Sequence, residues 1–485
     1  METNPPRLLL WDRGSVWDPI VKALTENGTC EVILRFAFEQ QGTHHSHPFY
    51  SGSFVHSEYR GGGQHIYDRV YETLPRFIDM NCRNSGFDYT TEYNEKTFHD
   101  HLHIFNQLFD YFYELLMANR IDILLFSRVP HLGADFLLYV IAQSLGIRSV
   151  FLWQSLFPEK FFFVYHWEDF GDFREVTRLT EPATHRIERK HEREWLSFYK
   201  PRDHTNVLTE QFRRTFKRMS DPETRRETIA HLVDFNHFVK FLTESMHKSP
   251  GSRFIKDLFS REMRGQALFR YQNEKRYRRD LNRAASRDFQ YEADYVYFPL
   301  HMQPEATTSA LGGIYFDQAL AIERLSKLIP ENWFIYIKDN PVQTSTMRGH
   351  WFFERIKAVK NAVIVPTETN TFELMHHCRF VSTITGTAGW EAVSGGTNAL
   401  VFGQAWYKTL PGVFSYDDHP TIEQILNYKI DHEELERSVG VLLSKMGDGV
   451  VDSGYLEIVP HFDPETNAQK VAKSLKKIIE NAPVP

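Results

Sequence analysis

The sequence predicts an α/β protein with two doubly wound, Rossmann-like domains and a helical insertion between them. Apolar strands alternate with helical segments near the N-terminus and again after residue 293, and a charged stretch without strand patterns separates the two series. The length of 485 residues suits about three domains. We expect an N-terminal α/β domain over 1–180, a charged helical region over 181–292 and a C-terminal α/β domain over 293–485.

The composition is that of an ordinary globular protein. Hydrophobic residues make up 42% of the chain and charged residues 25%, which argues against long disordered tracts. The 56 Lys and Arg residues against 63 Asp and Glu residues give a net charge of −7, so we expect no nucleic-acid partner. The three cysteines lie far apart, and no apolar run approaches the roughly 18 residues of a membrane span. We therefore expect a cytoplasmic protein without a disulfide framework.

The N-terminal elements follow a β-α-β pattern. Four apolar residues at 8–11 predict a strand, a helix over 16–26 follows, and a strand over 30–36 comes next. The pattern recurs with a helix over 98–117, a strand over 121–126, a helix over 134–145 and a strand over 149–153. Residues 40–95, rich in Gly, His, Ser and Tyr, are expected to form irregular excursions above the strand ends.

The predicted helical region ends in a basic stretch. Between Arg253 and Arg287 there are 11 Lys or Arg residues against four acidic residues, a local excess of seven positive charges. Such a stretch can contact an anionic membrane surface. It can equally be a solvated helix face with ion pairs between successive turns.

The C-terminal half alternates strands and helices again. The expected strands cover 295–299, 333–338, 363–365, 380–383 and 398–402, and the expected helices cover 316–328, 352–359, 371–378 and 389–393. A last helix over 465–481 is expected to cross back over the first domain. Because ligands bind at the carboxyl ends of strands in open α/β sheets, we expect a site between the two domains.

Polar loops at two strand ends carry candidate chemistry. After the strand at 295–299 come His301, Gln303 and Glu305, either catalytic side chains on a rigid base or a connecting loop with capping roles. After the next strand, Lys338 and Asn340 are candidates for contact with a phosphate, or simply form a solvated turn.

The segment 381–403 contains a strand, a loop of small residues and the start of a helix. Backbone N–H groups at a helix N-terminus, together with hydroxyls, can hold the phosphates of a nucleotide. The candidate binding residues are Ser382, Thr383, Thr385, Gly386, Thr387 and Glu391. Neither a GxGxxG nor a P-loop pattern is present, and a tight turn that packs strand against helix is the structural alternative.

One further histidine and the histidine-rich segments complete the candidates. His131, in the segment SRVPHLGAD, is a candidate base or acceptor-binding residue, or an ordinary polar surface residue. The histidines at 44–47 and 99–103 lack a His and carboxylate pair at the spacing of a zinc motif. We expect no metal site.

These loops resemble the capsule polysaccharide biosynthesis family, which is related to bacterial β-Kdo transferases. The resemblance rests on FPLHMQPEATTS, GGIYFDQ, KDNP, TITGTAGWEAVSGG and VFGQAWYKTLPGVF, with weaker support from FSRVPHLGAD and LGIRSVFL. It covers mainly residues 295–415. It implies a GT-B fold with an acceptor-binding N-terminal half and a nucleotide-sugar-binding C-terminal half.

The resemblance also implies roles for single residues. Glu305 matches the aspartate that acts on the anomeric carbon, and the additional methylene group of glutamate puts a covalent mechanism in doubt. Lys338 matches the lysine that contacts the donor phosphate. Asn340 replaces a histidine of that element, so an acid role is lost there while a hydrogen bond stays possible.

The function expected is transfer of a sugar from a nucleotide donor to a glycan or lipid-linked acceptor in capsule or surface polysaccharide synthesis. The resemblance favours a CMP-linked ulosonic acid as co-substrate, with no other cofactor. Such an enzyme is expected to work at the inner face of the membrane, where the stretch from Arg253 to Arg287 provides a peripheral contact. Two alternatives stay open: a non-catalytic export or carbohydrate-binding protein, and a sugar-nucleotide epimerase of the same architecture.

Overall fold

The computed structural model describes residues 5–37 except Arg13, 45–46, 61–84, 98–174 except His131 and Pro158, and 261–483 except Pro304, Val342, Thr344, Thr346, Met347 and Pro460. The chain divides into two compact units, one of Met1–Phe198 with Asp280–Pro485 and one of Tyr199–Arg279. The three-part division expected from the sequence stays a prediction.

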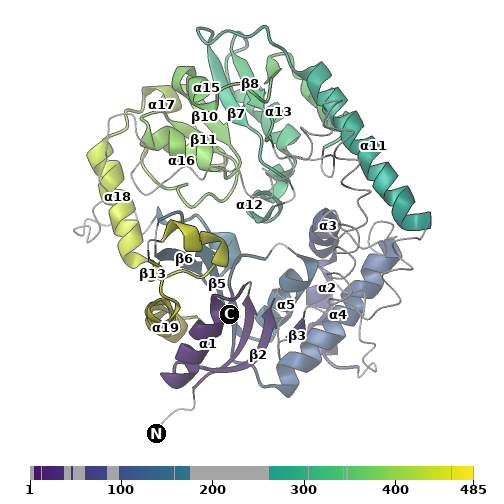
Figure 1. Ribbon diagram of the computed structural model, residues 1–485, viewed down its shortest axis with the longest axis vertical. Coiled ribbons are helices and arrows are strands. Elements are labelled where there is room, and N and C mark those ends of the chain that lie inside the picture. The colour runs from purple at the N-terminus through teal and green to yellow at the C-terminus, as the bar shows by residue number, and fades with distance from the viewer. Residues whose placement is uncertain are drawn as a thin grey trace, which may run out of the picture. The chain divides into compact units, whose positions relative to one another are not determined.

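The first sheet is built mainly from the N-terminal part of the chain (Figure 1). Its strands are β1 (Arg7–Asp12), β2 (Glu31–Ala37), β3 (His45–Ser46), β4 (Ile123–Phe126), β5 (Arg148–Gln154), β6 (Lys160–Val164) and β13 (Gly447–Asp448), in the order β13-β6-β5-β4-β1-β2-β3. The strands β1 to β5 pair in parallel, whereas β6 is antiparallel to β5 and to β13.

Alternate residues of β1 face two helical layers, which explains why the strand reads as a continuous apolar run. Leu8 and Leu10 pack in one cluster with α1 (Trp17–Glu26) and α19 (Pro464–Glu480). Leu9 and Trp11 pack in another cluster with helices of the opposite face. Those helices are α2 (Gln64–Tyr71), α3 (Leu74–Asn84), α4 (Phe98–Ala118) and α5 (Gly133–Ser144).

The expectation of irregular structure over 40–95 is wrong for residues 64–84, which form α2 and α3. Five of their apolar residues recur every three or four positions and lie in the core: Ile66, Val70, Leu74, Phe77 and Met80. This helical spacing is short and lies beside a Gly- and His-rich segment, which hides it in the sequence. Apart from His45 and Ser46, the remainder of 40–60 and 85–95 lies outside the described residues.

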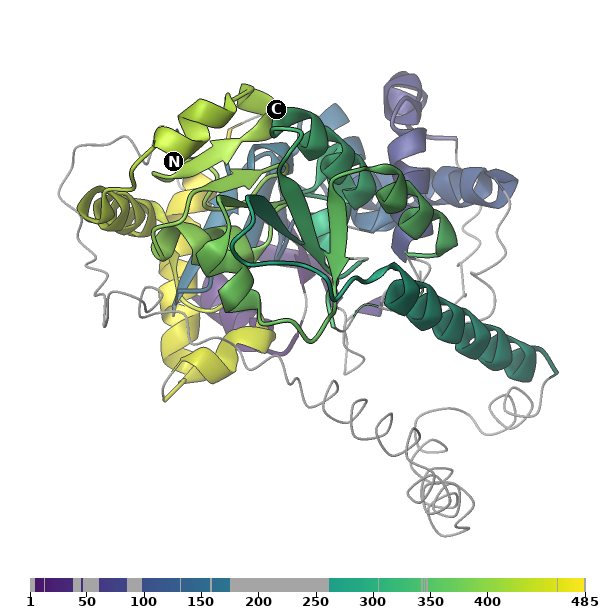
Figure 2. The ribbon, with the colours of Figure 1, turned by 90° about the horizontal axis from the view of Figure 1, so that it is seen from above.

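The second sheet has six parallel strands in the order β12-β11-β10-β7-β8-β9. They are β7 (Tyr295–Pro299), β8 (Phe334–Lys338), β9 (Ala362–Val365), β10 (Phe380–Thr383), β11 (Ala399–Val401) and β12 (Val413–Ser415). Figure 2 shows this sheet in green with helices on either side of it. The predicted α/β class is confirmed: two mostly parallel sheets carry flanking helices.

Four of the seven described helices between Ala306 and Lys445 begin at a residue whose side chain caps them. They are α12 (Ala306–Ser309), α13 (Gln318–Leu328), α14 (His350–Ala358), α15 (Thr371–His377), α16 (Thr387–Ser394), α17 (Ile422–Asn427) and α18 (His432–Lys445). Asp317 accepts a hydrogen bond from the Leu320 N–H, and Asn370 from the Phe372 N–H. The helix α16 begins at Thr387, two residues before the expected start, and its N-cap residue Gly386 has no side chain to cap it.

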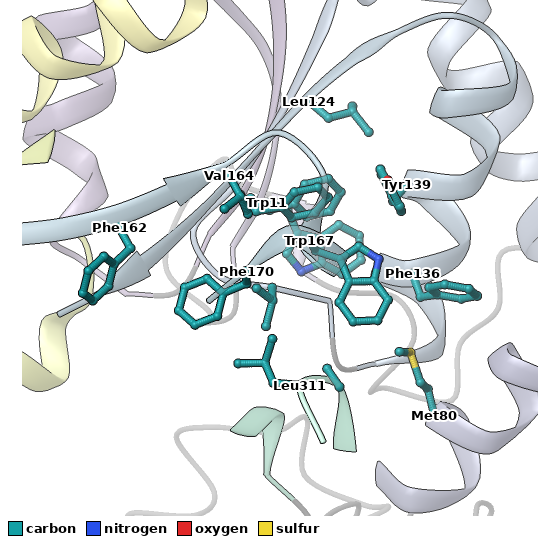
Figure 3. Packing of buried hydrophobic residues seen from close by; sticks show 14 of the residues in the cluster. Trp11, Met80, Leu124, Phe136, Tyr139, Phe162, Val164, Trp167, Phe170 and Leu311 are labelled. Carbon is teal, nitrogen blue, oxygen red and sulfur yellow. The ribbon is translucent and has the colours of Figure 1, made fainter. Parts of the chain in front are cut away.

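A single hydrophobic cluster joins residues of both sheets. Trp390 of α16 and Trp406 lie in this cluster with Phe157 and Phe162, and the ring centroids of Phe162 and Trp406 are 5.5 Å apart. Figure 3 shows Leu311 beside aromatic residues that follow β6. Burial of such large rings stabilises the packing of the C-terminal loops on the N-terminal half.

The C-terminal segment lies against the first half. The helix α19 packs on α1 (Figure 1). The indole Nε1 of Trp17 donates to the carbonyl of Val451 at 2.9 Å, and the Val451 N–H donates to the Gln154 side chain at 2.8 Å. These bonds fix the segment that follows β13 on the first sheet.

Most of the helical region expected over 181–292 lies outside the described residues. Its described end includes α11 (Arg261–Ala284), a helix as the charge pattern predicts. The exposed cations of the basic stretch that the structure describes are Lys275, Arg276, Arg279, Arg283 and Arg287. No helix within the described ranges combines the length and the apolar character needed to cross a membrane.

Candidate functional site

The candidate site lies where the strand order of the second sheet changes direction. From β7 the chain proceeds to β8 and β9 on one side, and from β10 it proceeds to β11 and β12 on the other. β7 and β10 are neighbours, so the loops after them leave the same edge of the sheet and diverge. In open α/β sheets, ligands bind in the crevice outside such a switch point. The loops that follow β7 and β10 lie at this switch point.

His301 connects the two loops. Its Nε2 lies 2.9 Å from the Thr383 hydroxyl and 3.4 Å from the backbone N–H of Thr385. A backbone N–H can only donate, so Nε2 is an acceptor and the ring proton resides on Nδ1. The Thr383 oxygen in turn accepts from the Gly386 N–H at 3.3 Å. His301 therefore holds the turn that leads into α16.

A buried ion pair supports His301 from the other side. The guanidinium of Arg348 bonds to the Asp339 carboxylate and to the carbonyl of His301, and both charged side chains have no exposed surface. Gln318 adds a bond from the His301 N–H to its side-chain oxygen at 2.8 Å. Burial, and next the nearby Arg348 charge, lower the pKa of His301 to about 3. The imidazole is therefore neutral at physiological pH.

Glu305 is the N-cap residue of the short helix α12 and its side chain is exposed. Enough protein surrounds the carboxylate that desolvation raises its pKa above the ordinary value of 4.5, while a hydrogen bond from Thr307 lowers it. The Thr307 hydroxyl lies 3.4 Å from the carboxylate, and the Thr307 carbonyl accepts from the Thr385 hydroxyl at 2.7 Å. The Glu305 loop is thus tied to the β10 loop at a second point.

Gln303 is buried and forms hydrogen bonds with residues outside its own loop. Its side-chain amide donates to the Phe316 carbonyl at 2.6 Å. Its backbone N–H donates to the Gln343 side chain at 2.7 Å, and the Gln343 amide donates back to the Gln303 carbonyl at 3.0 Å. The structure places Gln303 as a brace of the loop rather than at its surface.

Lys338 ends β8, next to the end of β7. Its Nζ donates to the Thr371 hydroxyl at 2.6 Å, and Thr371 is the first residue of α15. Desolvation lowers the pKa of Lys338, whereas the charge of Glu368 raises it. Asn340 follows directly, and its backbone N–H donates to the buried Asp339 side chain at 2.8 Å.

The remaining predicted residues surround the start of α16. The Ser382 hydroxyl is covered by protein and has no hydrogen-bond partner. The Thr387 hydroxyl donates to the Glu391 carboxylate at 3.1 Å, one helical turn further on. The buried Tyr407 hydroxyl donates to the Gly386 carbonyl. No side chain caps the N–H groups in the first turn of α16.

The structure brings most of the predicted residues to one edge of the sheet and adds partners that the sequence does not reveal. His131 lies outside the described residues. Arg348, Gln318, Gln343 and Tyr407 are the additional partners, and each acts through a contact distant in sequence. Arg348 stands in an irregular polar segment, where no periodicity or motif signals a buried arginine.

Among the residues that the structure describes, no group of three or more His, Cys, Asp or Glu side chains is arranged to hold a metal ion. The histidines at 99–103 lie along α4, where His101 is buried and contacts Asn81.

One family model matches part of the chain. The family model described as capsule polysaccharide biosynthesis protein matches residues 261–437. No curated protein sequence matches this chain significantly.

Solved structures show distant similarity. The β-Kdo 2,7 transferase of Thermosulfurimonas dismutans KpsC is 16% identical over 34% of this chain and 52% of that chain, with a TM-score of 0.23. The β-Kdo 2,4 transferase of the same protein is 16% identical over 37% and 55%, with a TM-score of 0.22. The UDP-GlcNAc 2-epimerase of Methanocaldococcus jannaschii is 10% identical over 98% and 99%, with a TM-score of 0.26.

This chain spans about half the length of the two transferase chains. The segment that the family model matches, residues 261–437, includes both loops of the switch point and most of the motifs on which the sequence resemblance rests.

Proposed function

We propose that this protein is a glycosyltransferase of capsule or surface polysaccharide biosynthesis. It transfers a sugar from a nucleotide donor to a glycan or lipid-linked acceptor, and we favour a CMP-linked ulosonic acid as donor. The observation that supports the proposal is the convergence of Glu305, Lys338 and the start of α16 at one sheet edge, inside the family-matched segment. The donor class itself comes from the sequence resemblance.

The donor phosphate binds at the start of α16. Uncapped N–H groups and the positive end of the helix dipole favour an anion there. Lys338 supplies the nearby positive charge when its ammonium leaves Thr371 for the phosphate. These groups stabilise the leaving phosphate in the absence of a metal ion.

Glu305 acts on the anomeric carbon. Its carboxylate is exposed to an incoming ligand, and its loop is braced by the Thr307 and Thr385 contacts. A carboxylate in this position either attacks the anomeric carbon or stabilises the positive charge that develops on the sugar ring. The length of the glutamate side chain favours the electrostatic role, because the carboxylate stands about a methylene further from its backbone than an aspartate would.

The acceptor is a glycan or a lipid-linked glycan, and the basic stretch provides a peripheral contact with anionic lipid. Each cation near such a surface contributes about 1 kcal/mol. Flotation with phosphatidylglycerol vesicles tests this part: binding that persists after Lys275, Arg276 and Arg279 are changed to glutamine contradicts it.

Incubation with a panel of CMP- and UDP-linked sugars, followed by mass analysis of products, tests the transferase. We expect thermal stabilisation by CMP and transfer from a CMP-linked sugar. Stabilisation by UDP alone with interconversion of a UDP-sugar indicates an epimerase instead. No response to either nucleotide indicates a non-catalytic protein.

A further inference from the structure

The site contains a buried charged pair that takes no part in the chemistry proposed above. Arg348 and Asp339 are each about 1% exposed, and they come from the segment before α14 and from the end of β8. A buried ion pair seldom adds stability, because desolvation of the two charges offsets their attraction. We therefore attribute the role of this pair to the groups that it holds in place.

What the pair holds is the backbone of His301. Arg348 donates from one terminal nitrogen to the Asp339 carboxylate and from the other terminal nitrogen to the His301 carbonyl. The Gln318 side chain binds the same backbone: its oxygen accepts from the His301 N–H at 2.8 Å, and its amide donates to the His301 carbonyl at 3.3 Å. His301 is thus held on both backbone groups before its ring makes any contact.

The ring of His301 makes its contacts on the opposite side, with the loop that leads into α16. Its Nε2 accepts a hydrogen bond from the Thr383 hydroxyl at 2.9 Å and one from the Thr385 N–H at 3.4 Å. Gly386 fits closely against the ring, since a Cβ there would lie 2.9 Å from His301 Cε1. The position of the imidazole therefore sets the direction of the first α16 N–H groups.

We propose that the Arg348–Asp339 pair is a positioning device for the anion-binding turn, which it controls through His301, and that His301 Nε2 serves as a hydrogen-bond acceptor rather than as an acid or a base. The proposal rests on the proposed function for the identity of the anion, a nucleotide phosphate. The charged groups that face His301 are Arg348 and, behind it, Asp339, while Gln318, Thr383 and Thr385 are neutral partners. An added proton on Nε2 would remove the acceptor and point a donor at the Thr385 N–H, which can only donate.

The first experiment is nuclear magnetic resonance of protein labelled with ¹⁵N-histidine, with His301 identified from the spectrum of His301→Gln. We expect the neutral tautomer with the proton on Nδ1, unchanged from pH 5 to pH 8. A double variant, Arg348→Met with Asp339→Asn, removes both charges together and leaves no unpaired buried ion. In it we expect the pKa of His301 to rise, because the lowering effect of the Arg348 charge is gone while that of burial remains.

The matched control is Arg355→Met on α14. Arg355 makes ion pairs with Asp317 and Glu323 at 2.7 Å and 2.9 Å, but it does not contact His301. We expect this variant to leave the His301 spectrum unchanged. A normal His301 titration in the wild-type protein, or a proton on its Nε2, overturns the proposal.

The second experiment measures affinity for CMP by calorimetry. We expect a loss of about tenfold or more in the double variant and in His301→Ala, the size of one good hydrogen bond. His301→Gln, whose side-chain oxygen replaces the Nε2 acceptor, should recover part of the affinity lost in His301→Ala. Equal losses in both His301 variants, or unchanged affinity in the double variant, contradict the positioning role. If the wild-type protein binds neither CMP nor UDP, the proposed function fails, while the spectrum of His301 still decides the tautomer.

Discussion

His301 Nε2 lies 2.9 Å from the Thr383 hydroxyl, and this contact joins the loops after β7 and β10. The two strands are the pair at which the sheet changes direction. Residues 82 positions apart in the chain therefore meet where an α/β sheet binds its ligands.

Stability of the protein should fall as the pH drops below about 6.5, in part because of His301. A histidine with a folded pKa of about 3 takes up its proton only in the unfolded chain over this range. Each pH unit then lowers the free energy of unfolding by about 1.4 kcal/mol, which gives about 2 kcal/mol between pH 6.5 and pH 5. Urea unfolding at both pH values should show a smaller loss for His301→Gln than for the wild-type protein. A loss of the same size in both proteins contradicts the neutral buried imidazole.

Glu305→Gln should abolish sugar transfer while nucleotide binding stays intact. The amide is of similar size but carries no charge to attack or stabilise the anomeric carbon. Turnover and CMP-induced thermal stabilisation are the two measurements, and Glu354→Gln, an exposed acid on α14 paired with Lys357, is the control. Retained turnover in Glu305→Gln would falsify the catalytic assignment.

Thr307→Val should move the acid limb of the pH–rate profile to higher pH. Desolvation by the surrounding protein raises the pKa of Glu305, and the Thr307 hydroxyl partly counteracts this by stabilising the ionised form. Removal of the hydroxyl raises the pKa further, so activity that needs the carboxylate is lost earlier as the pH falls. A limb that stays in place, measured as kcat/KM against pH, shows that ionised Glu305 is not the group that limits the rate.

Lys338→Ala should weaken nucleotide binding. A charge-assisted hydrogen bond to phosphate contributes about 1.5–3 kcal/mol, or roughly a 10- to 150-fold change in affinity. Lys327→Ala removes an exposed lysine from α13 and should have no effect. Unchanged CMP affinity in Lys338→Ala would remove the phosphate-neutralising role.

Gly386→Ala should disturb the anion-binding turn. The new methyl group would lie 2.9 Å from both the His301 ring and the Thr383 hydroxyl, closer than real Cβ contacts permit without a shift. We expect about 1–3 kcal/mol of destabilisation and weaker nucleotide binding. Gly349→Ala introduces the same methyl group into open space and serves as the control. Equal melting temperatures and affinities for the two variants would show that the turn tolerates the methyl group.

The strands of the second sheet could be predicted from the sequence because each is a short apolar run that ends in polar residues. β7 and β10 have the predicted bounds, and the loops that follow them carry the candidate site. Local signals sufficed here, since strand, loop and helix start are adjacent in the chain.

Other features depend on partners that are distant in the chain, and the sequence does not reveal them. β13 has two residues and exists only because it pairs with β6. Arg348 becomes a buried ion only through Asp339 and the carbonyl of His301. The sequence also suggested His301 as a catalytic group, and its hydrogen bonds and low pKa, which only the structure shows, lead to the acceptor role proposed above.

The return of the C-terminal segment to the first sheet has a consequence for synthesis on the ribosome. The edge of β6 pairs with β13, and the apolar face of α1 packs against α19. The first half therefore cannot complete its core until nearly the whole chain has emerged from the ribosome. An uncovered strand edge during that interval invites pairing with another nascent chain. Truncation after Lys445 should therefore yield aggregated protein, rather than a folded N-terminal half.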